Sequence, residues 1–93
     1  MTESEIFAAL TRNLVDVLPD LLGVHITADL TMRELGANSI DRMDVLIGTQ
    51  EELGVTIPVS EFGAAQELGS LVAVFAEYTK QETGPSAGAG RRI

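Results

Sequence analysis

The chain has 93 residues, a formal net charge of −8 and no cysteine. This length permits one small domain, and the missing cysteine excludes disulfides, thiolate metal sites and a cysteine nucleophile. All fourteen acidic residues precede Thr83, with only four basic residues among them. So acidic a surface argues against nucleic-acid partners, and no apolar run approaches the ~18 residues of a membrane span. Residues 1–20 lack the apolar region of a signal peptide, so a cytoplasmic location is expected.

Apolar periodicity predicts an all-α four-helix bundle, with three main helices, one short helix and a long first loop. We expect one folded domain over residues 1–82 and a flexible tail rich in Gly, Pro and Ala over residues 83–93. The Arg91-Arg92 pair in this tail could contact an acidic partner, although a tail without a specific role is the leading interpretation. The predicted elements are a helix over 4–18, a connection over 19–38 with a helical turn at 31–35, and helices over 39–53, 59–64 and 67–81.

The same periodicity predicts which side chains face the core. In the first helix, capped by Thr2 or Ser4, they are Ile6, Phe7, Leu10, Leu14, Val17 and Leu18. The long connection could fill gaps in the core with Leu21, Leu22, Val24, Ile26, Leu30, Met32 and Leu35. In the second helix the inward residues are predicted to be Ile40, Met43, Leu46, Ile47, Gln50 and Leu53. In the last helix they are predicted to be Leu68, Leu71, Val72, Phe75 and Tyr78.

Ser39 is the principal candidate for chemistry, because it stands where a loop ends and the second helix begins. A serine at such a position can cap the helix, or its hydroxyl can stay exposed and open to modification. The approach through Gly36, Ala37 and Asn38 is short and sterically open. A self-contained serine hydrolase is disfavoured, because His25 is the only possible base and no Gly-x-Ser-x-Gly turn is present. No catalytic or metal site is therefore predicted.

The run Leu35-Gly36-Ala37-Asn38-Ser39-Ile40, followed by Asp41, resembles the Asp-Ser-Leu site of acyl carrier proteins. The resemblance reaches from about residue 4 to residue 81. It includes the order of the helices, the long first loop and the run Glu-Glu-Leu-Gly-Val-Thr-Ile-Pro over residues 51–58. It implies a non-catalytic carrier on which a phosphopantetheinyl transferase attaches 4′-phosphopantetheine from coenzyme A to Ser39. Acyl groups would then travel between enzymes as thioesters on this arm.

The resemblance also implies a docking surface for partner enzymes around the start and the acidic side of the second helix. Its predicted members are Asn38, Ile40, Asp41, Arg42, Met43, Asp44, Glu51 and Glu52. One departure from the family is Asn38, where the family usually has aspartate. This change removes a charge beside the phosphate and any metal that the transferase holds, so it bears on which transferase recognises the chain.

Within the family, the runs at residues 38–42 and 57–65 look most like free-standing carriers of polyketide synthesis, particularly those of β-branching cassettes. Partners of that class are ketosynthases, acyltransferases and enzymes like hydroxymethylglutaryl (HMG) synthase, and a monomer is expected. Alternatives are a peptidyl carrier of non-ribosomal synthesis, or a small acidic adaptor in which Ser39 only caps a helix. Core packing is the leading role, and lining of an acyl cleft the second, for Leu46, Ile47, Phe62, Ala65 and Leu71.

Overall fold

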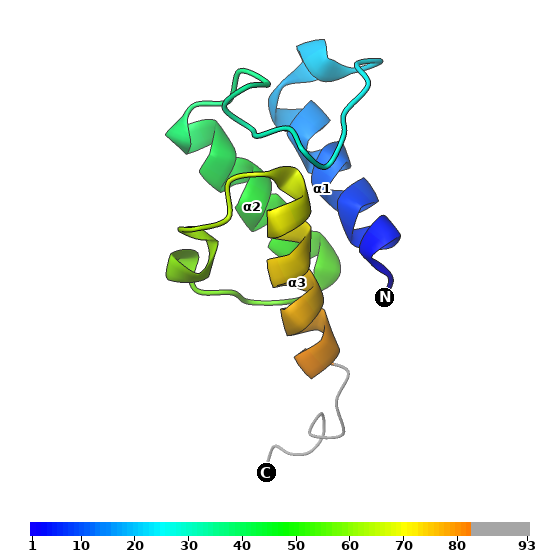
Figure 1. Cartoon of the computed structure of the whole chain (residues 1–93), viewed down its shortest axis with the longest axis vertical. Coiled ribbons are helices and arrows are strands. Elements are labelled where there is room, and N and C mark those ends of the chain that lie inside the picture. The colour runs from blue at the N-terminus through cyan, green and yellow to red at the C-terminus, as the bar shows by residue number, and fades with distance from the viewer. Residues whose placement is uncertain (83–93) are drawn as a thin grey trace.

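The computed structural model describes residues 1–82, in which three α-helices pack around one apolar core (Figure 1). They are α1 (Glu3–Val17), α2 (Ser39–Leu53) and α3 (Leu68–Glu82). Two short 3₁₀ helices, η1 (Pro19–Leu21) and η2 (Val59–Phe62), lie in the connections. The predicted all-α bundle with three main helices is confirmed. η2 lies where the short helix over residues 59–64 was predicted, whereas η1 was not predicted. The predicted tail, including Arg91-Arg92, lies outside the described residues.

The start of α1 is set by a capping box, in which two side chains satisfy amide groups that the first turn leaves unpaired. Thr2 Oγ1 accepts from the Glu5 amide at 3.1 Å, and Glu5 Oε1 accepts from the Thr2 amide at 2.7 Å. Thr2, not Ser4, is therefore the cap. The fully buried side chains of this helix are Ile6, Ala9, Leu10 and Leu14.

The predicted bounds of α2 are confirmed, but its predicted inward face is wrong at two positions. Ile40 is 72% exposed and Ile47 is 46% exposed, whereas Val45, Leu46 and Thr49 are completely buried. At 3.6 residues per turn the buried three fall within about 100° of one another, and the two isoleucines fall on the opposite side. The core therefore covers the face that carries Val45, Leu46 and Thr49. On this face the Thr49 hydroxyl donates a hydrogen bond to the Val45 carbonyl at 2.7 Å.

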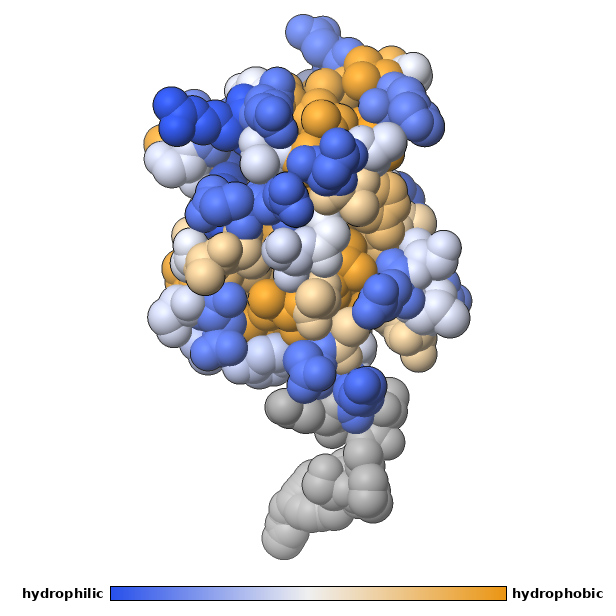
Figure 2. All heavy atoms as spheres, in the orientation of Figure 1, coloured by the Kyte–Doolittle hydropathy of each residue, from blue (hydrophilic) through white to orange (hydrophobic). Residues whose placement is uncertain are grey.

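The first loop crosses one end of the bundle and contributes fewer side chains to the core than predicted. Leu21 and Met32 are buried, but Leu22 is 79% exposed and Val24 is 47% exposed. Figure 2 shows hydrophobic surface on the upper right, the side on which Figure 1 places this loop. His25 is also exposed there. The prediction that all these apolar residues fill the core is therefore only partly correct.

The second half of the loop is held by backbone contacts to α3 and by its own turn. The Leu68 and Gly69 amides donate to the carbonyls of Leu30 and Ala28, each at 2.9 Å. The turn predicted over residues 31–35 is present and ends at Gly36, whose φ of +98° favours glycine. These contacts fix the path of the chain into the start of α2.

The region where η2 and α3 meet α2 is closed by packed side chains. The Phe62 and Phe75 rings lie 5.3 Å apart between centroids. Four of the five residues considered for an acyl cleft are core residues, 0–6% exposed, while Ile47 is exposed; the four are Leu46, Phe62, Ala65 and Leu71. Their leading interpretation as core is confirmed. Within residues 1–82, no helix is long and apolar enough to cross a membrane.

Candidate functional site

Asn38, and not Ser39, caps α2. Asn38 Oδ1 accepts a hydrogen bond from the backbone amide of Asp41 at 2.8 Å, and Asp41 Oδ2 accepts one from the backbone amide of Asn38 at 3.2 Å. The cap is therefore reciprocal, as at the start of α1. Of the two roles that the sequence left open for Ser39, capping belongs to its neighbour.

Ser39 is the first residue of α2 and its side chain is exposed. Its hydroxyl makes no hydrogen bond with any residue of the described range. Ala37, two residues earlier, is buried and its amide donates to the Met32 carbonyl at 3.0 Å. The hydroxyl is thus carried on a fixed backbone while remaining open to another protein.

A hollow of about 270 Å³ lies beside Ser39, between the end of the first loop, the start of α2 and the residues before α3. Six of its eight lining residues have polar side chains, two of them arginines, although apolar atoms form most of the lining surface. The lining residues are Thr31, Met32, Arg33, Ala37, Asn38, Ser39, Arg42 and Gln66. Arg33 and Gln66 were not among the predicted site residues. The only sequence signal for Arg33 was its rarity, as one of four basic residues among residues 1–82.

Arg42 joins the hollow to the η2 segment. Its Nη2 donates to the Phe62 carbonyl at 3.0 Å and to the Ala65 carbonyl at 2.9 Å. Such charge-assisted bonds are stronger than neutral ones. Arg42 therefore fixes the position of the η2 segment relative to the start of α2, a contact that connects residues far apart in sequence. The docking role predicted for Arg42 stays a prediction.

The other predicted docking residues fall into two groups. Asp44 and Glu51 are exposed and, at helical spacing, share the outward side of α2 with Ile40 and Ile47. Met43 and Asp41 are half-buried, and the carboxylate of Asp41 is used by the cap.

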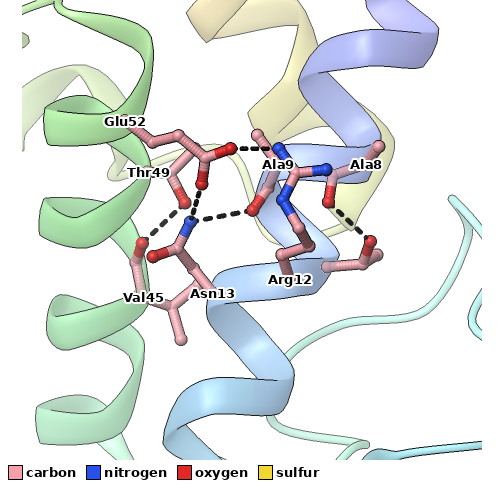
Figure 3. A network of polar contacts seen from close by, with 8 residues as sticks. Ala8, Ala9, Arg12, Asn13, Val45, Thr49 and Glu52 are labelled. Carbon is pink, nitrogen blue, oxygen red and sulfur yellow. Dashed lines mark hydrogen bonds and ion pairs between the residues drawn. The ribbon is translucent and has the colours of Figure 1, made fainter.

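Glu52, the last predicted docking acid, is engaged by α1 (Figure 3). Its carboxylate pairs with the Arg12 guanidinium and accepts from the Asn13 amide nitrogen at 3.0 Å. The same Asn13 nitrogen donates to the Ala9 carbonyl at 2.8 Å. The hydrogen bond from Arg12 lowers the pKa of Glu52 below its usual 4.5; burial opposes this lowering, and the hydrogen bond from Asn13 adds to it. This contact connects α1 to α2 at the end remote from Ser39.

The fold and the site are those of a carrier protein, a helical bundle that presents the exposed hydroxyl of Ser39 at a helix start. The family described as phosphopantetheine attachment site matches residues 12–75. This is more than half of the chain, so the protein belongs to that family, whose members carry covalent 4′-phosphopantetheine. It is an acyl carrier protein of the kind used in polyketide biosynthesis.

Two relatives support this identification. The chain is 34% identical over 74 residues to the polyketide biosynthesis acyl-carrier-protein AcpK of Bacillus subtilis (strain 168), covering 80% of this chain and 90% of that one. It also shares its fold with a chain of the crystal structure of the curacin biosynthetic pathway HMG synthase in complex with acetyl donor-ACP. That match has a TM-score of 0.78 at 22% identity, and covers 83% of this chain and 99% of the other.

The residues around Ser39 fit the prosthetic group. Its hydroxyl is exposed and has no competing partner among residues 1–82. It also adjoins a hollow whose charged lining is positive, and a phosphodiester is an anion. When bound, the group supplies a flexible arm ending in a thiol that forms thioesters. The chain itself has no cysteine, so it offers no competing thiol.

Proposed function

We propose that Ser39 is the attachment residue and that a phosphopantetheinyl transferase modifies it. In the transfer, a bond forms between Ser39 Oγ and the pantetheine phosphorus while the pyrophosphate bond of coenzyme A breaks. The hydroxyl proton passes to a base, and adenosine 3′,5′-bisphosphate leaves. The observation that carries this proposal is the free, exposed hydroxyl of Ser39 beside a cap supplied entirely by Asn38 and Asp41.

We further propose that the carrier serves a β-branching step and delivers a small acyl group to an HMG-synthase-like enzyme. The named relatives support this, because one is a polyketide carrier and the other an acetyl donor bound to an HMG synthase. The closed core between α2, η2 and α3 is consistent with a short acyl group that remains on the exposed arm.

The outward side of α2 is the proposed docking surface for these enzymes. Ile40, Asp44, Ile47 and Glu51 follow one another at spacings of four, three and four residues, so they form one exposed stripe. Acidic groups steer a basic partner toward the carrier, and the isoleucines supply apolar contact close to Ser39. Such contacts are weak and short-lived, as a carrier with several partners requires. A monomeric, cytoplasmic protein with a carrier domain over residues 1–82 completes the proposal.

Intact-mass spectrometry tests the attachment. Incubation with coenzyme A and a broad-specificity transferase is expected to add about 340 Da, the mass of the arm in this family. Ser39→Ala is expected to abolish the addition, while Ser70→Ala, at an exposed serine of α3, is expected to preserve it. Loading of Ser39→Ala, or no loading of the wild type by several transferases, would refute the assignment.

A further inference from the structure

The hollow beside Ser39 has a charge opposite to that of the rest of the protein. Among residues 1–82, Arg33 and Arg42 are the only charged residues that line it. Residues 1–82 contain fourteen acidic and four basic residues, and half of those basic residues line this one hollow. No acid lines it, although the carboxylates of Glu34 and Asp41 are hydrogen-bonded to the lining residues Thr31 and Asn38. An anion is therefore favoured here in a protein whose surface otherwise repels anions.

Both arginines keep hydrogen-bond donors available. The Arg33 side chain is exposed and forms no hydrogen bond or ion pair with any residue of the described range. Arg42 uses only Nη2 for its two carbonyl contacts, and a guanidinium carries five N–H groups. Its remaining N–H groups have no partner among residues 1–82. An arginine fork matches the geometry of phosphate oxygens.

Asn38 contributes to the same preference. Its Oδ1 is occupied by the Asp41 amide, which leaves the side-chain NH₂ as its available half. An aspartate in this position would cap the helix equally well, but would offer a second acceptor and a negative charge to the hollow. The asparagine therefore presents donors to an anion where the carboxylate would repel it.

The size of the hollow limits what it can hold. Sites for whole drug-sized ligands measure roughly 300–1,000 Å³, and this one measures about 270 Å³. It can accommodate a phosphodiester and the first atoms beyond it, but not a complete arm. Because Ser39 lines the hollow, a phosphate attached to its hydroxyl lies at the edge of the hollow.

We propose that this hollow binds the phosphodiester at the root of the arm, with Arg33 as its main ligand and Arg42 and Asn38 as supporting donors. The inference rests on the proposed attachment at Ser39. Since exposed charge pairs contribute about 0.2–1 kcal/mol, the bound arrangement is favoured roughly 1.5- to 5-fold. The arm is thus directed along the carrier between encounters, and a partner enzyme can release it easily.

Nuclear magnetic resonance of the loaded protein tests this, because the phosphodiester is its only phosphorus. Arg33→Gln is expected to narrow the ³¹P signal by increasing local motion. Lys80→Gln in α3 makes the same charge change away from the hollow, and is expected to leave the signal unchanged. In the wild type, the Arg33 Nε–H resonance is expected to differ between the unloaded and loaded forms. This chemical-shift difference is expected to become smaller at about 1 M salt, because the electrostatic screening length is then about 3 Å.

The possible failures are distinguishable. If the wild type never gains the mass of the arm, the proposed attachment falls, and this inference with it. If loading occurs but the Arg33 resonance does not shift, and ³¹P relaxation is equal in wild type, Arg33→Gln and Lys80→Gln, only the phosphate site is refuted. The resonance comparison uses the wild type alone, so it decides the question even if Arg33→Gln is loaded poorly.

Discussion

Asn38 and Asp41 exchange two hydrogen bonds across the first turn of α2, and this exchange leaves the intervening serine free. The bonds measure 2.8 Å and 3.2 Å, and each satisfies an amide that the helix start would otherwise leave unpaired. An attachment serine needs a fixed backbone and an unengaged hydroxyl. The pair supplies the first without using the second.

Removal of this cap should destabilise the protein. Asn38→Ala is expected to lower the free energy of unfolding by about 1 kcal/mol, the usual cost of losing such a cap. Asn38→Asp is expected to stay close to the wild type, because aspartate caps equally well. Urea unfolding followed by circular dichroism measures both. Equal stability of Asn38→Ala and the wild type would show that the capping box contributes nothing.

Replacement of Arg42 should loosen the η2 segment. Arg42→Met removes two charge-assisted bonds to the Phe62 and Ala65 carbonyls and is expected to cost about 2 kcal/mol of unfolding free energy. Arg33→Met is the matched control, since Arg33 has no side-chain bond within residues 1–82. Amide hydrogen exchange should accelerate at Ala65, whose amide donates to the Phe62 carbonyl at 3.1 Å. Unchanged exchange there would contradict the proposed restraint.

The contact between α1 and α2 predicts an unusual response at Gly48. Glycine to alanine inside a helix normally stabilises by about 1 kcal/mol. Here a new Cβ would overlap Asn13 Oδ1 and lie 3.3 Å from Asn13 Cγ, which displaces Asn13 from Ala9 and Glu52. We therefore expect Gly48→Ala to lose this gain in the wild type and to recover it in the Asn13→Ala background. Thermal unfolding of the four proteins forms the cycle; an equal gain in both backgrounds would rule out the clash.

The Arg12–Glu52 ion pair makes the folding stability of the protein depend on pH in the acidic range. The pKa of Glu52 is lowered in the folded state, so its contribution is complete above the unfolded value of about 4.5 and is lost as the pH falls through the lower folded value. Arg12→Gln removes the main cause of the lowering and should flatten the fall in melting temperature between about pH 5 and about pH 3. Arg33→Gln should retain the wild-type slope. Identical slopes for all three proteins would show that the pair is not linked to folding.

Charge reversal on the outward side of α2 tests docking. Asp44→Arg is expected to raise the KM of an HMG-synthase-like partner for the loaded carrier by roughly three- to tenfold, because rim charges govern association. Glu77→Arg, at an exposed acid of α3, is the control with the same charge change. Helicity should be unchanged in both. Equal effects of the two variants would indicate general electrostatics instead of a docking surface.

The helices, and Ser39 as the proposed attachment residue, could be predicted from the sequence because their signals are local. Apolar spacing, Gly54 after the second helix and the Asn-Ser-Ile-Asp run act within a few residues of one another. The sequence alone could not decide which residue caps the second helix. Asn38 and Ser39 are both good caps, and the choice depends on the backbone path that the turn ending at Gly36 imposes.

Only the tertiary structure decided which faces are buried and which charges are available. Ile40 and Ile47 have the composition of core residues, yet the packing of the bundle selects Val45, Leu46 and Thr49 instead. The partners of Arg42 lie twenty and twenty-three residues away, a pairing that no local pattern encodes. Hydrophobic burial is non-directional, so a sequence determines how much apolar surface must be covered. The packing of one helix against another determines which surface that is, and at Ser39 it gathers two arginines at the one serine proposed to carry a phosphate.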